Sequence, residues 1–227
     1  MKVKEIFNGS FAVYYEMVIN RIASPIQIDR WRKALVRAAK VLVPHAKVVL
    51  DCCSGAGNVG KFYLKENPEA LLINCDISTP LLKLAKKRFG KNASYIRSDN
   101  RFFPLKEGSI DVLFSSFCVR NSPDPELTVS EAFRVLKPGA VWAILDFFKL
   151  DDRSICSAAN NLIFRSFMKV NSIVNREAIE YLFESIEKFY TVREFEELLE
   201  DSGFEVTEVK RFMGGVANTV IAVRREV

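Results

Sequence analysis

The stretch VVLDCCSGAGNVG, residues 48–60, decides the fold class. It begins as an apolar run typical of a buried strand, reaches an acid at Asp51, and then places Gly55, Gly57 and Gly60 ahead of a helix-compatible segment. Glycines at a strand-to-helix turn permit positive φ and let a ligand approach backbone N–H groups, and the N-terminus of the following helix favours electron-rich atoms. The stretch therefore predicts a nucleotide-binding turn.

The class of ligand is open at this point, because the three glycines also spell the G-x-G-x-x-G of dinucleotide-binding folds, with Asp76 about one βαβ step further on. Asp51 distinguishes a dinucleotide from other ligands. A carboxylate at the carboxyl end of the strand suits a ligand with an ammonium group and is unfavourable beside a pyrophosphate. We therefore expect a cationic ligand. An NAD-binding oxidoreductase and a glycine-rich turn that binds nothing are the alternatives.

Length and composition predict one domain, since the chain has 227 residues and is 49% hydrophobic. The formal net charge of +5 is spread along the chain, so nucleic acid is not an expected partner. No apolar run reaches the roughly 18 residues that a membrane span needs, and the start MKVKEIFNGSF lacks an apolar signal segment. We expect a cytoplasmic protein.

The cysteines are odd in number and form no C-x-x-C pair, and His45 is the only histidine. Such a pattern favours free thiols that are buried as small hydrophobic side chains over a disulfide framework or a zinc site. We therefore expect no metal and no disulfide among the five: Cys52, Cys53, Cys75, Cys118 and Cys156.

Strand and helix patterns alternate five times, which predicts a parallel sheet with helices on both faces. The expected strands are 48–51, 71–76, 93–97, 110–115 and 140–147, and Lys137-Pro138-Gly139 is expected to be a turn before the last of them. Two further strands, 204–211 and 216–223, flank Gly214-Gly215 and should form an antiparallel hairpin at the sheet edge. The predicted fold is a doubly wound α/β domain with a seven-stranded, mostly parallel sheet.

Helical segments should flank this single domain, which spans 1–227. Residues 1–43 are expected to form a helical cover, with core covering preferred over a substrate lid for 1–23. The helix from about residue 25 should turn Trp31 and Leu35 inward. Its remaining surface is basic and expected to be solvated: Arg30, Arg32, Lys33, Arg37 and Lys40. Residues 151–190, which lie outside the alternation, should form a helical lid insertion.

Acidic and polar residues follow successive strands of the predicted sheet. Asp51, Asp76, Asp99 and the segment 115–121 each stand at a carboxyl end, where open parallel sheets bind ligands. Asp76 is suited to accept both hydroxyls of a ribose, and Asp99 with Asn100 could hydrogen-bond an adenine amino group. Each of these residues alone could instead be an ordinary helix N-cap. Their convergence predicts one nucleoside site at this edge.

Four segments together resemble class I S-adenosylmethionine-dependent methyltransferases: VVLDCCSGAGNVG, NCDIS, SDN and RVLKPGA. More narrowly, SFCVRN (116–121), RVLKPGAVWAILDF, YLFESI with TVREFEELLEDSGFEV, and MGGVANTVIAVRR resemble the ubiquinone and menaquinone biosynthesis C-methyltransferases over nearly the whole chain. The resemblance implies a Rossmann-like fold and S-adenosyl-L-methionine as cofactor. The chain departs from the family at Glu16 and Asn58, where Asp is usual, and at Cys52-Cys53-Ser54, which replaces a smaller, glycine-bearing turn.

The resemblance assigns cofactor roles to matching positions. The strand end at Asp51 with Gly55 and Gly57 would hold the methionine part, Asp76 the ribose and Asp99 the adenine side. The cofactor residues that we predict are Asp51, Ser54, Gly55, Gly57, Asp76, Ile77, Asp99, Asn100 and Ser116.

Methyl transfer from a sulfonium to a quinol carbon requires alignment, exclusion of water and loss of a phenolic proton, and it needs no metal. The predicted catalytic residues are Arg120, Asn121 and Asp76. Arg120 beside Asn121 could stabilise the phenolate, and Asp76 or a water that it orients could receive the proton. Alternatively, Arg120 is a helix-capping or surface ion-pair residue.

The expected acceptor is a prenylated lipid or another small molecule, and residues 154–183 could line a tunnel for its tail, rest on a membrane surface at the inner face, or be a plain lid. N- or O-methylation of a lipid or small metabolite is the alternative activity. Base methylation of nucleic acid is not supported, because Phe117-Cys118-Val119 replaces the motifs of those enzymes. A protein that binds the cofactor without catalysis and a homodimer both remain open.

Overall fold

The computed structural model describes residues 25–150 and 176–226. The predictions for residues 1–24 and 151–175, which include most of the expected lid, lie outside the described residues. Within the described ranges, no helix has the length and apolar character to cross a membrane.

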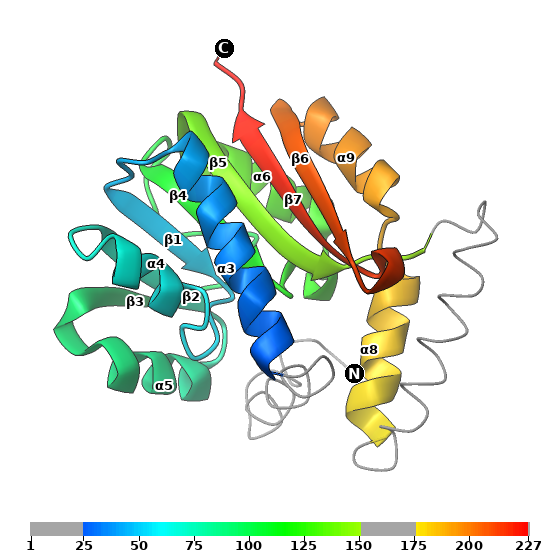
Figure 1. Ribbon diagram of the computed structural model, residues 1–227, viewed down its shortest axis with the longest axis horizontal. Helices are drawn as coiled ribbons and strands as arrows, with labels where there is room; N and C mark the ends of the chain where they lie inside the picture. Colours follow the sequence, from blue (N-terminus) through cyan, green and yellow to red (C-terminus); the bar gives the residue numbers. More distant parts are fainter. Residues whose placement is uncertain (1–24, 151–175, 227) are drawn as a thin grey trace.

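A single seven-stranded sheet forms the centre of the molecule, in the order β3-β2-β1-β4-β5-β7-β6 (Figure 1). The strands β1 to β5 pair in parallel, and β7 runs antiparallel to both of its neighbours. The fold prediction is confirmed, including the antiparallel hairpin with β6 at the edge. The strands are β1 (Val48–Cys52), β2 (Leu71–Asp76), β3 (Ala93–Arg97), β4 (Ile110–Ser116), β5 (Leu136–Phe147), β6 (Phe204–Phe212) and β7 (Ala217–Arg224).

Hydrophobic side chains alternate between the two faces of this sheet and form two cores. Val49 packs on one face with residues of α3 (Pro25–Leu42), α4 (Gly60–Glu66) and α8 (Arg176–Glu187). Leu50 packs on the other with residues of α6 (Pro125–Val135) and α9 (Val192–Asp201). Helix α5 (Thr79–Phe89) follows β2. Strands buried on both faces explain the continuous apolar runs of the sequence.

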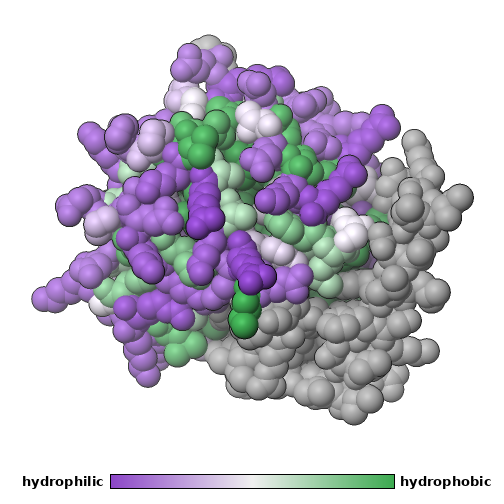
Figure 2. Space-filling model, in the orientation of Figure 1, coloured by the Kyte–Doolittle hydropathy of each residue, from purple (hydrophilic) through white to green (hydrophobic). Residues whose placement is uncertain are grey.

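The outer surface of α3 differs from the prediction at one residue. Arg30, Lys33 and Arg37 are exposed as expected, and Figure 2 shows hydrophilic side chains over much of this face of the described molecule. Arg32, however, is only 5% exposed, because its side chain turns toward the sheet, where Nε donates to Ser116 Oγ at the end of β4, while Nη1 stays 3.5 Å from Asp29. The prediction of a solvated Arg32 is wrong. A period of 3.6 residues places it beside Trp31 at the border of the buried stripe.

Strand β5 begins earlier than predicted. It starts at Leu136, which pairs with Ile110, whereas Val112 pairs with Val141. The extra residues of Lys137-Pro138-Gly139 therefore form a bulge within the strand instead of a turn before it, and Gly139 takes a φ of +74° there. Proline and glycine are tolerated at a bulge because it leaves backbone groups outside the hydrogen-bond ladder.

Candidate active site

The order of the sheet reverses at β1, which lies between β2 and β4. The turn after β1 begins with a hydrogen bond from Ser54 N to Cys75 O at 3.0 Å and closes with one from Gly57 N to Ser54 O at 2.8 Å. Gly55 and Gly57 have φ values of +56° and +75°. Asp51 is buried at 1% exposure, and its Oδ2 accepts the N–H of Gly60 at the start of α4 at 3.1 Å. Asp51 therefore supports the turn from inside the protein.

Two features favour glycine at position 57: the positive φ and the short distance to a neighbouring side chain. A Cβ at this position would lie 2.2 Å from Cε2 of Phe89, whereas a Cβ at Gly108, with a φ of +57°, would meet nothing within 4 Å. We expect Gly57→Ala to lower the free energy of unfolding by about 2–4 kcal/mol, through left-handed strain plus a steric clash. Gly108→Ala should lose only the strain part, about 1–2 kcal/mol. Urea unfolding of both variants tests this, and equal losses would show that the turn has room for a side chain.

Asp76 joins two turns at the end of β2. Its Oδ2 accepts Gly55 N at 2.9 Å and its Oδ1 accepts Ser78 N at 2.8 Å. The residue is 7% exposed. A carboxylate oxygen carries a second lone pair, so both oxygens keep the capacity to accept hydroxyl groups of a ligand. Ile77, between these two anchored residues, accepts a hydrogen bond from Arg97 Nε at its carbonyl oxygen at 3.1 Å.

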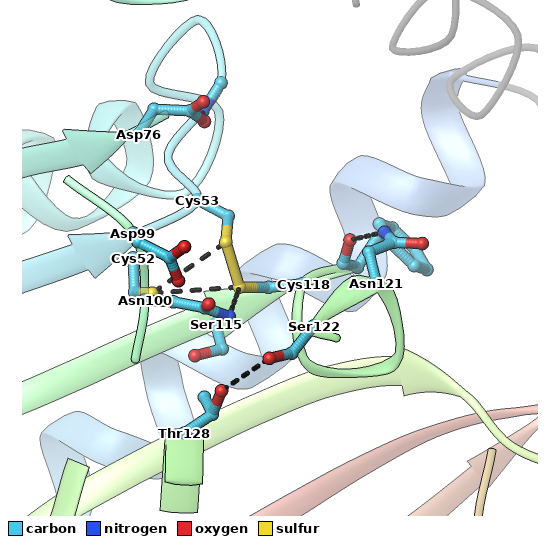
Figure 3. The surroundings of a disulfide bond; sticks show 12 residues. Cys52, Cys53, Asp76, Asp99, Asn100, Ser115, Cys118, Asn121, Ser122 and Thr128 are labelled. Atoms are coloured by element: carbon cyan, nitrogen blue, oxygen red, sulfur yellow. Dashed lines mark hydrogen bonds between the residues drawn. A yellow bond between two sulfur atoms is a disulfide. The ribbon is translucent and has the colours of Figure 1, made fainter. Parts of the chain in front are cut away.

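The segment after β3 places its polar residues beside the turn after β4. Asp99 forms an ion pair with Arg101, whose Nη2 lies 2.8 Å from Oδ2. Asn100 Nδ2 donates to Cys118 Sγ at 3.5 Å. Figure 3 shows Asp76, Asp99 and Asn100 at neighbouring strand ends on one side of Cys53 and Cys118, with Asn121 on the other side. The structure therefore brings the predicted ribose, adenine and acceptor residues to one edge of the sheet.

The segment after β4 positions the predicted acceptor residues. Arg120 forms an ion pair with Asp146 of β5, and both side chains are fully buried. Asn121 donates from Nδ2 to Phe117 O at 2.9 Å and accepts at Oδ1 from the hydroxyl of Tyr181 in α8 at 3.1 Å. The guanidinium of Arg120 is thus held by a carboxylate. Its predicted role as a direct partner of a phenolate gains no support from this placement.

Ser116 completes the predicted cofactor set. It lies at the carboxyl end of β4, and its Oγ accepts a hydrogen bond from Nε of Arg32 at 3.4 Å. Arg32 therefore connects α3 to the site, a link that the sequence analysis missed.

The cysteines differ from the prediction. Cys53 and Cys118 are joined in a disulfide, so the expectation of five free thiols is wrong for this pair. Cys52 and Cys75 are free and buried as expected. Burial raises the pKa of Cys52 well above its ordinary value and, with a smaller contribution from Asp76, raises the pKa of Cys75 to about 12. Cys53 and Cys118 follow β1 and β4, two strands that pair with each other. This placement was the available signal for a link between them.

Two buried hydroxyl groups beside Asp76 bear on whether the site takes a polar ligand. The hydroxyls of Ser54 and Ser78 are buried and have no hydrogen-bond partner among the described residues. Both flank the carboxylate of Asp76, beside a glycine turn whose backbone lets a ligand come close. Buried polar atoms usually have partners, so these two hydroxyls indicate that a polar ligand completes the site.

The mixed sheet with β7 antiparallel, the glycine turn after β1 and the acid after β2 define a class I S-adenosylmethionine-dependent methyltransferase. A solved S-adenosylmethionine-dependent methyltransferase from Aquifex aeolicus has this fold, with a TM-score of 0.56 and 21% identity over 78% of this chain and 82% of the other.

The chain belongs to the ubiE/COQ5 methyltransferase family, which it matches over residues 1–224. It is 30% identical to the ubiquinone/menaquinone biosynthesis C-methyltransferase UbiE of Campylobacter jejuni, over 97% of each chain. It is also 30% identical to the mitochondrial 2-methoxy-6-polyprenyl-1,4-benzoquinol methylase of Caenorhabditis elegans, over 96% of this chain and 78% of the other. The protein is a methyltransferase with S-adenosyl-L-methionine as its cofactor.

Proposed function

We propose that this enzyme methylates a ring carbon of a reduced, prenylated quinol, as a step of menaquinone or ubiquinone biosynthesis. The observation that carries the proposal is the full-length match to the ubiE/COQ5 family, together with relatives whose names specify quinone C-methylation. The polar site at the strand ends supports it, since it offers hydrogen-bonding groups for a nucleoside.

We propose that the cofactor lies across the carboxyl ends of β3, β2, β1 and β4. Ser54, Gly55 and Gly57 would hold the methionine part, with Asp51 fixing the turn through Gly60. The ribose would lie against Asp76 and Ile77, and the adenine against Asp99 and Asn100. Ser116 would border the acceptor side. This order follows the order of the strands, so each part of the ligand meets the loop of one strand.

The bound cofactor supplies an electrophilic methyl group, and the protein residues align the acceptor and handle its proton. Asn121 is the residue that we propose next to the acceptor oxygen, since its amide is oriented by Phe117 and Tyr181. Arg120 would act as a positioning residue that holds this segment against Asp146. The oxygens of Asp76 accept two backbone N–H groups, which stabilise the carboxylate, so we propose that it orients a water through which the phenolic proton passes to solvent.

We further propose that the chain is one domain and that residues 151–190 cover the acceptor. Helix α8 supports this, because Leu182 packs in the core while Tyr181 reaches Asn121. A prenylated acceptor resides in membranes, so the proposal includes a cytoplasmic protein that touches the inner face of the membrane peripherally. Contact of this kind gains about 25 cal/mol per Å² of apolar surface removed from water.

The acceptor is tested by incubating the enzyme with trideuteromethyl-labelled S-adenosylmethionine and a panel of acceptors. We expect label on a ring carbon of a reduced demethylquinol with a prenyl tail, located by mass fragmentation and NMR. The oxidised quinone is the matched control and should remain unlabelled, because it has no phenolic proton to lose. Label only on amine or hydroxyl acceptors would replace the proposal with N- or O-methylation of a lipid or metabolite.

A further inference from the structure

The disulfide between Cys53 and Cys118 links the two turns that border the site. Cys53 directly follows β1 and Cys118 follows β4, and these neighbouring parallel strands pair Cys52 with Ser115. The link spans 65 residues of sequence, with the two Cα atoms 5.7 Å apart. On one side it adjoins Ser54 and Gly55, and on the other it precedes Arg120 and Asn121. One covalent bond therefore ties the proposed cofactor turn to the proposed acceptor turn (Figure 3).

A third cysteine and one amide surround this bond. The Sγ atom of Cys52 lies 3.7 Å from that of Cys118 and 3.9 Å from that of Cys53. Asn100, from the segment after β3, donates to Cys118 Sγ. The turns after three strands thus meet at this disulfide. Reduction or formation of the disulfide therefore affects all three turns directly.

Both turns have backbone conformations that side-chain-bearing residues rarely adopt. Cys53 has a φ of +51°, and Phe117, next to Cys118, has a φ of +57°. Such left-handed residues persist only where the surrounding structure holds them in place. A covalent link between the two turns supplies that restraint, so less conformational freedom is lost when a ligand binds between them.

We propose that Cys53 and Cys118 form a reversible thiol–disulfide site whose oxidised state binds S-adenosylmethionine more tightly than its reduced state. The proposal rests on the cofactor site described above and extends it to regulation by thiol reductants and oxidants. Disulfides in reducing compartments are usually transient and redox-sensing, so a reversible bond agrees with the proposed cytoplasmic location.

Reduction would proceed by exchange with a dithiol. One reductant thiolate attacks Sγ of Cys53, the less buried of the two sulfurs, and the bond to Cys118 breaks with the electron pair leaving on Cys118, which takes a proton. The second reductant thiolate then attacks the reductant sulfur of the mixed disulfide and releases Cys53, which takes a proton. The protein gains two thiols and the reductant becomes a disulfide. Cys52 stays a thiol throughout, because burial disfavours its thiolate, the form that could displace either sulfur.

The same three sulfurs could instead bind a soft cation when reduced. The Sγ atoms of Cys52, Cys53 and Cys118 lie within 4.8 Å of one another. A cation site needs all three, whereas the disulfide needs only two. Replacing Cys52 with alanine therefore distinguishes the two possibilities.

The first experiment counts thiols. The full-length protein is prepared with and without dithiothreitol, alkylated under denaturing conditions and weighed by mass spectrometry. The chain has five cysteines, and we expect two of them to be protected in the oxidised sample, in a cross-linked peptide pair that contains Cys53 and Cys118. All five should react after reduction. Full alkylation of the oxidised sample would overturn the proposal. So would about one equivalent of zinc bound to the native protein, if that zinc is absent from Cys52→Ala.

The second experiment measures binding of S-adenosylhomocysteine by calorimetry. We expect the Kd of the reduced protein to be about fivefold higher than that of the oxidised protein. Cys53→Ala/Cys118→Ala should bind like the reduced protein under both conditions, whereas Cys52→Ala should keep the difference. Equal affinities, or tighter binding after reduction, would contradict the coupling. Absence of binding in both states would contradict the proposed cofactor site as well, and the thiol count would still decide whether the disulfide exists.

Discussion

Replacing Asp76 with alanine is expected to raise the Kd for S-adenosylmethionine about 100-fold, as measured by isothermal titration calorimetry. The substitution removes the acceptor that holds Gly55 N and Ser78 N and, in our proposal, the ribose hydroxyls. Hydrogen bonds to a charged group contribute about 1.5–3 kcal/mol each, and about 1.4 kcal/mol corresponds to a tenfold change in affinity. The loss of one or two such bonds to the ligand therefore accounts for the expected factor.

Asp111 provides a matched control at the opposite end of the sheet. Its Oδ2 accepts two backbone N–H groups, from Lys47 at 2.9 Å and Val48 at 2.8 Å, and its Oδ1 pairs with Lys137. Asp111→Ala should thus destabilise the fold by a similar mechanism and leave the affinity for the cofactor unchanged. Equal affinity of wild type and Asp76→Ala would refute the proposed site. An equal loss in both variants would show that the effect is one of stability.

Replacing Arg120 with alanine is expected to lower the free energy of unfolding by about 3–5 kcal/mol, because it leaves the buried carboxylate of Asp146 without its cation. For a chain of this size the melting temperature should fall by about 10 °C. Binding of S-adenosylmethionine at low temperature should survive, since Arg120 is placed on the acceptor side. Urea unfolding followed by circular dichroism measures the first effect and calorimetry the second.

A neutral replacement of the pair is the control for Arg120. In Arg120→Met/Asp146→Asn the carboxamide oxygen can still accept from Phe147 N, which lies 2.9 Å from Asp146 Oδ1, and no charge is left unpaired. The longer bond from Arg120 N to Oδ2, at 3.3 Å, is lost. This double variant should recover most of the lost stability. If Arg120→Ala instead unfolds at the wild-type urea concentration and loses methyl transfer, the guanidinium serves the acceptor directly, as the sequence analysis first suggested.

The sheet could be predicted because its strands and helices have different apolar periods and because β-α alternation has few topologies. The bulge at Lys137-Pro138-Gly139 could not, since proline and glycine also mark turns and only the register of β4 with β5 distinguishes the two. Arg32 was placed in solvent because its burial depends on contacts with Asp29 and Ser116, which are a local and a distant partner.

The strand-end acids of the site could be predicted because a parallel sheet places carboxyl ends at one edge. Their hydrogen-bond partners could not. Asp51 bonds the start of α4 and Arg120 pairs with Asp146, and neither contact follows from spacing along the chain. The disulfide was missed for a related reason, since an odd number of cysteines argues against a framework but not against a single link between adjacent turns.

A crystal structure with S-adenosylhomocysteine would show directly where the cofactor binds. We predict the ribose hydroxyls within hydrogen-bonding distance of the Asp76 carboxylate, the amino-acid end against the turn of Ser54 to Gly57, and the adenine beside Asp99. A ligand bound at another edge of the sheet, with these residues empty, would contradict the account.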